Sequence, residues 1–154
     1  MLQVGAPAPP FRLESDTGET VSLADLRGSR VVLYFYPRDN TSGCTTEARE
    51  FQDLLGAFEA LGVRVIGVSR DSLRSHARFR EKLGLTFPLL SDPDHRVMAA
   101  YGAWGEKRAR GKVAEGPIRT TVVIGPDGTV ERVYPKVRAR GHAAQVLRDL
   151  GAGG

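Results

Sequence analysis

The chain has 154 residues, a formal net charge of +4 and a single cysteine. This length suits one hydrophobic core, so we expect one domain over residues 1–154, with residues 151–154 as a flexible tail. No apolar stretch approaches membrane-spanning length, and the N-terminus lacks the basic segment and apolar core of a signal peptide. One cysteine excludes an intramolecular disulfide, and a free thiol fits a reducing, cytoplasmic location.

Short apolar segments rich in β-branched and aromatic residues indicate strands. We expect these strands over residues 11–14, 19–23, 31–36, 63–69, 87–90, 120–124 and 129–134. The first two flank Asp16-Thr17-Gly18 and the last two flank Pro126-Asp127-Gly128, which are both turn signals of a β-hairpin.

Apolar residues at three- and four-residue steps indicate helices. The longest such pattern covers residues 44–61, and further helices are expected over residues 72–83, 94–101 and 142–150, with one helical turn over 23–26. Ser72 is a suitable N-cap for the second helix and Gly84 a suitable stop. The Gly-, Lys- and Arg-rich residues 105–116 are expected to form a loop.

The order of these elements predicts an α/β fold with a mixed sheet. A strand, a helix and a strand in succession imply a right-handed parallel crossover. The antiparallel hairpin and closing helix that follow fit a sheet with helices on both faces. A thioredoxin-like fold with an N-terminal β-hairpin extension has this arrangement.

The only cysteine, Cys44, lies where a buried strand turns into a helix. Pro37 ends the strand because it has no N–H for a sheet ladder, and the free N–H groups and positive dipole of the helix start stabilise a thiolate. Thr41, one helical step earlier, can donate its hydroxyl to the sulfur or to a substrate oxygen, and Pro37 can form an apolar wall. The pattern is that of a nucleophile pocket, although a lone cysteine is most often a small buried hydrophobic residue.

The segment from Pro37 to Glu47 resembles the active-site signature of the peroxiredoxins, in particular the branch called bacterioferritin comigratory protein or peroxiredoxin Q. Two further segments, Tyr101–Lys107 and Ile118–Thr121, are similar to family segments and occur in the same order. The resemblance covers nearly the whole chain. It implies the same thioredoxin-like fold and a peroxidase that reduces hydrogen peroxide and organic hydroperoxides through a sulfenic acid on Cys44.

The resemblance also implies that Arg119 is the active-site arginine. It enters the last hairpin, so in this fold it can lie beside the strand that leads to Cys44, and a guanidinium can hold both a thiolate and a peroxide oxygen. Without the resemblance, Arg119 would be interpreted as one more solvated arginine. Glu47 either orients Arg119 or complements the helix N-terminus, Arg38 is solvated or adds positive potential, and Trp104 is a core aromatic or a pocket wall.

The chain departs from many members of this branch because it has no second cysteine. Arg49 occupies the position, five residues after the nucleophile, where many members carry one, and the helix expected over residues 72–83 has none. The sulfenic acid therefore cannot be resolved within the chain. We expect a one-cysteine, monomeric peroxiredoxin whose reductant is an external thiol: thioredoxin, a glutaredoxin or a small thiol.

Two other functions are alternatives on the same fold. A thiol–disulfide oxidoreductase is disfavoured because Thr41 stands where the first cysteine of a C-x-x-C pair would be, which leaves only a monothiol type. A non-catalytic chaperone or nucleic-acid-binding module would have to use the basic residues 106–112 and 132–140, but such runs are usually solvated faces. Phosphate-loop motifs are absent and the three histidines have no ligand spacing, so we expect no cofactor, metal or nucleic-acid partner.

Overall fold

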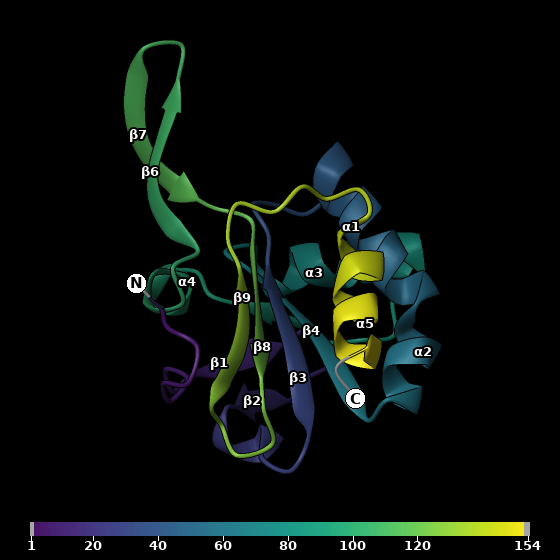
Figure 1. Cartoon of the computed structure of the whole chain (residues 1–154). Helices are drawn as coiled ribbons and strands as arrows, with labels where there is room; N and C mark the ends of the chain where they lie inside the picture. Colours follow the sequence, from purple (N-terminus) through teal and green to yellow (C-terminus); the bar gives the residue numbers. More distant parts are fainter. Residues whose placement is uncertain (1, 153–154) are drawn as a thin grey trace.

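Apolar, β-branched residues form the centre of a seven-stranded mixed sheet in the computed structural model, which describes residues 2–152 (Figure 1). The sheet contains β1 (Arg12–Ser15), β2 (Thr20–Ser22), β3 (Arg30–Phe35), β4 (Val63–Ser69), β5 (Leu89–Ser91), β8 (Thr120–Ile124) and β9 (Val130–Tyr134), in the order β2-β1-β5-β4-β3-β8-β9. The helices are α1 (Ser42–Asp53), α2 (Leu55–Ala60), α3 (Leu73–Leu83), α4 (Arg96–Ala100) and α5 (His142–Ala152), with a 3-10 turn at Ala24–Leu26.

The predicted α/β class, thioredoxin-like sheet and N-terminal hairpin are confirmed. Strands β3 and β4 are parallel and are joined through α1 and α2, as the crossover prediction requires. Strands β1 and β2 pair antiparallel across the Asp16–Gly18 turn. Strand β8 runs antiparallel to β3, and Thr120 lies opposite Phe35. This register brings Arg119, which directly precedes β8, to the end of β3 from which the chain leads to Cys44.

Two hydrophobic cores lie on the two faces of the sheet, so helices cover both faces as predicted. The core that contains Cys44 lies between the sheet and α1, α2, α3 and α5, and Phe51, Phe58, Phe79 and Val146 contribute to it. The opposite core includes Met98 of α4 together with residues of the N-terminal segment and the 3-10 turn. Figure 1 shows α4 apart from the other four helices.

The single helix predicted over residues 44–61 is wrong in two details. The helix begins at Ser42, so Cys44 lies inside its first turn, and it is interrupted at Leu54, which separates α1 from α2. The apolar pattern continues across the interruption because Phe51, Leu55 and Phe58 all point into the core. Hydrophobic periodicity reports the buried face of a segment and not the continuity of its hydrogen bonds.

The loop predicted over residues 105–116 is instead a β-hairpin, β6 (Trp104–Ala109) and β7 (Lys112–Pro117), which extends away from the main sheet (Figure 1). Arg110 and Gly111 both have positive φ values, 53° and 76°, as in a two-residue type I′ turn. The two strands pair only with each other, and most of β7 is exposed. An uncovered hairpin needs no apolar alternation, which is why the sequence pattern did not reveal it.

The predicted flexible tail over residues 151–154 begins inside a helix, because α5 continues to Ala152. Residues 153 and 154 lie outside the described residues. None of the described helices is both long enough and apolar enough to cross a membrane.

Gly67 in β4 leaves room for the ring of Tyr34, its partner in β3, beside the Cys44 core. A methyl group at this position would lie 3.0 Å from Tyr34 Cζ and 3.0 Å from Leu89 Cδ2. We expect Gly67→Ala to lower the free energy of unfolding by about 1–3 kcal/mol, because overpacking forces neighbouring side chains to move. Urea denaturation measures this difference.

Gly56 in α2 is the matched control, because an added Cβ there has no neighbour within 4 Å. Gly56→Ala is expected to raise the free energy of unfolding by about 0.5–1 kcal/mol, as for alanine in a helix. Equal effects of the two substitutions would show that Gly67 is not tightly packed.

Candidate active site

Cys44 is the third residue of α1, and the connection from β3 places it there. Thr41 has the extended conformation of an N-cap residue, with φ −78° and ψ 155°, and its carbonyl accepts the Thr45 N–H at 2.9 Å. The N–H groups of the first turn, including those of Gly43 and Cys44, have no carbonyl of a preceding turn to bond. The positive end of the helix dipole therefore lies close to Cys44, a residue that is 1% exposed.

Arg119 joins Cys44 to Glu47. Its Nη2 donates to Cys44 Sγ at 3.4 Å, and its Nη1 donates to Glu47 Oε1 at 2.6 Å. Gly43 allows this approach, because a Cβ there would lie 3.0 Å from Arg119 Nη2. Arg119 itself is held by Val137, whose N–H donates to the Arg119 carbonyl at 2.8 Å. The predicted placement of Arg119 beside the strand that leads to Cys44 is therefore observed.

The charged groups of this cluster influence one another strongly. Burial raises the pKa of Glu47 to about 7, although the positive charge of Arg119 opposes this shift. Burial also lowers the pKa of Arg119, but the charges of Glu47 and Cys44 outweigh it, so the pKa of Arg119 is raised and the guanidinium stays protonated. Glu47 Oε2 is buried and has no hydrogen-bond partner among the described residues. Nearby, burial and then the Arg119 charge lower the pKa of His142 to about 4.

Thr41 and Pro37 lie in the same loop but do not contact the sulfur through hydrogen bonds. The Thr41 hydroxyl donates to the Arg38 carbonyl at 2.9 Å, so it is not directed at Cys44 in this structure. The lone pairs of its oxygen remain able to accept a hydrogen bond from an incoming group. Pro37 is half-buried at the end of the strand, where an apolar wall was expected.

Glu47 and Trp104 had two interpretations each. Glu47 contacts Arg119 directly, so it orients the guanidinium and does not merely complement the helix end. Trp104 stacks on His95 with ring centroids 3.8 Å apart, and the Arg70 guanidinium lies 5.0 Å from its ring centroid. Trp104 therefore packs as a structural aromatic.

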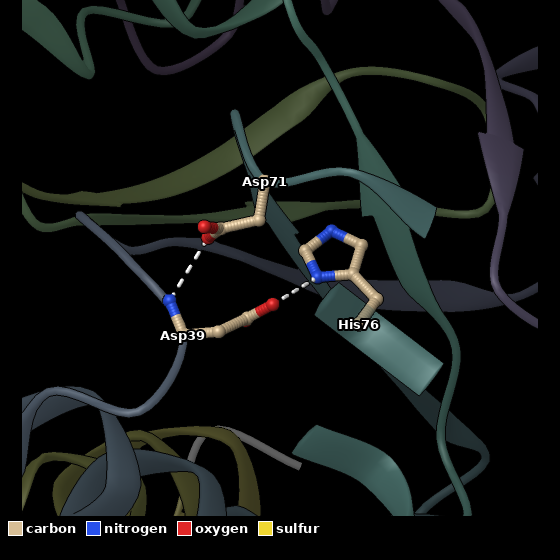
Figure 2. Close-up of side chains that lie close together, drawn as sticks. All are labelled: Asp39, Asp71 and His76. Carbon is tan, nitrogen blue, oxygen red and sulfur yellow. Dashed lines mark hydrogen bonds and ion pairs between the residues drawn. The ribbon is translucent and has the colours of Figure 1, made fainter. Parts of the chain in front are cut away.

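A buried polar cluster beside the loop was missed at the sequence level. Asp39 of the loop before α1, Asp71 between β4 and α3, and His76 of α3 have ligand atoms within 4.8 Å of one another (Figure 2). The atoms that face one another are already engaged in protein hydrogen bonds, so the cluster is a hydrogen-bond network. Its only sequence signal is an aspartate inside the nucleophile loop, because 37 residues separate Asp39 from His76.

An open cavity of about 700 Å³ lies beside Arg119, between the β6–β7 hairpin and the segment after β9. It is lined by Glu106, Lys107, Arg108, Ile118, Arg119, Lys136 and Val137. Four of these residues are basic and one is acidic, so the approach to Arg119 carries a positive potential.

Comparisons with known proteins agree with this geometry. The profile of the AhpC/TSA family matches residues 4–133. Peroxiredoxin Bcp of Bacillus subtilis is 42% identical over 97% of this chain and 95% of its own length. The structure of the bacterioferritin comigratory protein of Xanthomonas campestris, which was described for its alkyl peroxide reduction activity, matches with a TM-score of 0.89 at 38% identity, over 99% and 98% of the two chains. A mutant PrxQ of Xylella fastidiosa matches with a TM-score of 0.92 at 37% identity, over 99% and 98%.

The raised pKa of Glu47 predicts a pH-dependent stability. Because the pKa is about 7 in the folded protein and 4.5 ordinarily, Glu47 binds its proton more tightly when folded, so its stabilising contribution is complete below pH 4.5 and is lost as the pH rises to about 7. Glu47→Gln, which is always neutral, should not show this loss. Across this pH range we expect the free energy of unfolding of the wild type to fall relative to the variant, on the order of 2–3 kcal/mol.

Glu59→Gln on the exposed face of α2 is the control, and its curve should run parallel to that of the wild type. Denaturant titrations at several pH values measure all three proteins. Parallel curves for wild type and Glu47→Gln would contradict the raised pKa.

Proposed function

Because the chain belongs to the AhpC/TSA family, we propose that Cys44 is its peroxide-reducing nucleophile and that Arg119, Thr41 and Pro37 complete the site. The chain is a thiol-dependent peroxidase, with a peroxide as substrate and a thiol as reductant. The observation that carries the residue assignment is the 3.4 Å contact between Arg119 Nη2 and Cys44 Sγ. The oxidoreductase and non-catalytic alternatives are not favoured by this family membership.

In the oxidation step, the Cys44 thiolate attacks the terminal oxygen of the hydroperoxide. The sulfur–oxygen bond forms as the oxygen–oxygen bond breaks, so Cys44 becomes a sulfenic acid, and the leaving oxygen takes a proton and departs as water or an alcohol. Negative charge moves from the sulfur to the leaving oxygen, and fixed donors are most effective where charge develops. Arg119 and the free N–H groups at the start of α1 supply such donors, and Thr41 can position the peroxide.

We extend the substrate to organic hydroperoxides as well as hydrogen peroxide. The Xanthomonas campestris relative has alkyl peroxide reduction activity. In this chain, apolar surface from Ile118 and Val137 lines the cavity beside Arg119, which suits an alkyl group.

The second half of the reaction needs an external thiol, because the chain has no other cysteine. The thiol attacks the sulfenic sulfur, water leaves, and a mixed disulfide forms; a second thiol then releases reduced Cys44. Lys107, Arg108 and Lys136 around the cavity favour a small thiol that carries carboxylates over a neutral or cationic one. Among thioredoxin, glutaredoxin and small thiols, we therefore propose a small anionic thiol.

We further propose a monomer in the cytoplasm. The exposed large hydrophobic side chains in the described part of the chain are Val4, Leu61 and Val113, which lie on separate elements and form no evident common patch. A free thiol as the reacting group fits a reducing compartment.

Cys44→Ser should abolish peroxide consumption while the circular dichroism spectrum stays unchanged. Arg119→Ala should slow the oxidation of Cys44 by about 10²–10³-fold, because a preorganised donor at the reacting atoms is lost. Stopped-flow oxidation with hydrogen peroxide, followed by mass spectrometry of Cys44, gives the rates.

Arg78→Ala on the exposed face of α3 is the matched arginine control and should react like the wild type. Peroxide consumption by Cys44→Ser, or an unchanged rate in Arg119→Ala, would contradict the assignment.

The positive cavity predicts that the charge of the thiol matters. At equal thiolate concentration, thioglycolate should reduce the oxidised protein faster than cysteamine, and added salt should diminish the difference. Charge reversal in Lys136→Glu should reduce this preference, whereas Lys82→Glu on exposed α3 should preserve it. An equal rate for both thiols in the wild type would rule out the anionic-thiol proposal.

A further inference from the structure

His76, in the first turn of α3, is fully buried and has a hydrogen-bond acceptor at each ring nitrogen. Figure 2 shows one of these acceptors, Asp39. Its Nδ1 lies 2.8 Å from Asp39 Oδ2, and its Nε2 lies 2.9 Å from the Leu90 carbonyl oxygen. A carbonyl oxygen can only accept, so Nε2 carries a proton. The protonation state of the ring therefore depends on Asp39.

Asp39 is surrounded by donors. The Tyr36 hydroxyl donates to Oδ1 at 2.6 Å, and the Ser75 hydroxyl donates to Oδ2 at 2.8 Å. These two hydroxyls fill only part of the acceptor capacity of the carboxylate, so Asp39 Oδ2 also accepts a hydrogen bond from His76 Nδ1–H. With protons on both nitrogens, His76 is an imidazolium, and the two residues form a buried ion pair.

The groups that face the imidazolium favour its positive charge. Burial lowers the pKa of His76, but the hydrogen bond and charge of Asp39, the Leu90 carbonyl and the charge of Asp71 together raise it above its ordinary value. Tyr36 also faces the ring, and burial holds the pKa of its hydroxyl well above the usual range, so it remains a neutral donor.

Asp39 also holds the nucleophile loop, residues 37–41, through its backbone. Its N–H donates to Asp71 Oδ2 at 2.9 Å, and that oxygen also accepts the Ser69 hydroxyl at 2.6 Å. The next residue, Asn40, has a φ of 65°, in the left-handed region that non-glycine residues rarely occupy. Surrounding contacts must hold such a conformation in place, and α1 begins two residues later.

We propose that Asp39 and His76 are positioning residues of the peroxidase: their buried ion pair holds the nucleophile loop against α3, and this keeps Cys44 Sγ within reach of Arg119. The inference rests on the proposed role of Cys44. Neither residue touches the sulfur through a described hydrogen bond, so both act through the loop backbone. An error of about 1 Å in the placement of a reacting group can reduce a rate about 10²-fold. Loss of the Asp39–His76 ion pair can therefore slow the reaction measurably even though neither residue touches the sulfur.

The test measures Cys44 oxidation by hydrogen peroxide in single-turnover experiments on the full chain. His76→Asn keeps a neutral donor near Asp39 and removes the charge, and we expect it to slow oxidation by at least about tenfold at neutral pH. The ratio of the wild-type rate to the variant rate should shrink as the pH rises through the raised pKa of His76, because the wild-type ring then also becomes neutral. Asp39→Asn with His76→Asn should be no slower than the worse single variant.

Two serines separate positioning from stability. Ser75→Ala removes one donor to Asp39, whereas Ser72→Ala removes the N-cap of α3, whose oxygen accepts the Ser75 N–H, and leaves the Asp39 contacts intact. We expect Ser75→Ala to slow oxidation and Ser72→Ala to leave it unchanged, even where Ser72→Ala destabilises the fold as much. This pair decides the question if His76→Asn does not fold.

A pH-independent rate ratio, or rates that follow only the loss of stability across all variants, would overturn the proposal. If the wild type itself reacts with peroxide no faster than free cysteine, the proposed role of Cys44 fails instead. The two failures are therefore distinct.

Discussion

The antiparallel register between β3 and β8 determines which residues meet at the start of α1. Because Thr120 lies opposite Phe35, the residue before β8 and the loop after β3 emerge at the same edge of the sheet. Arg119 is thereby delivered to the first turn of α1, 75 residues away from Cys44 in sequence. A shift of one residue would turn every side chain of β8 to the other face and move Arg119 away from the sulfur.

The register brings Arg119 to Cys44, and burial strengthens the electrostatic interaction between the two side chains. The Arg119 side chain is only 15% exposed, so its guanidinium interacts more strongly with a thiolate than it would in water, since the local dielectric is lower. Glu47 holds the guanidinium in place but also competes with the sulfur for its charge. The raised pKa of Glu47 reduces that competition below neutrality, because a protonated carboxyl carries no charge while it still accepts a hydrogen bond.

The local parts of this site were predictable from sequence, and the long-range parts only partly so. Pro37, Thr41 and Cys44 lie within eight residues, so the strand-to-helix boundary was enough to predict that they lie together where the strand turns into the helix, whereas their proposed roles rest on the family resemblance. Arg119 needed both the family resemblance and the topology, since nothing in its own neighbourhood distinguishes it from other arginines. The Asp39–His76 pair was not predicted, because it depends on how closely α3 packs against the loop, which no periodicity encodes. The β6–β7 hairpin was not predicted for the opposite reason: most of β7 is exposed, so its sequence carries no pattern of buried residues.

The start of α1 is held from two sides by buried ion pairs, Glu47–Arg119 toward β8 and Asp39–His76 toward α3. Removing charges from water is expensive, and well-packed apolar residues often replace a buried ion pair without loss of stability. Stability alone is therefore a weak reason for either pair. Ion pairs and their hydrogen bonds are directional, whereas apolar contacts tolerate sliding, so two such pairs restrict the rotation and translation of the first turn of α1. In the proposed role of Cys44, a nucleophile that must meet a peroxide oxygen in line with its leaving group needs this kind of restriction, and a chain with one cysteine has no second thiol that could replace it.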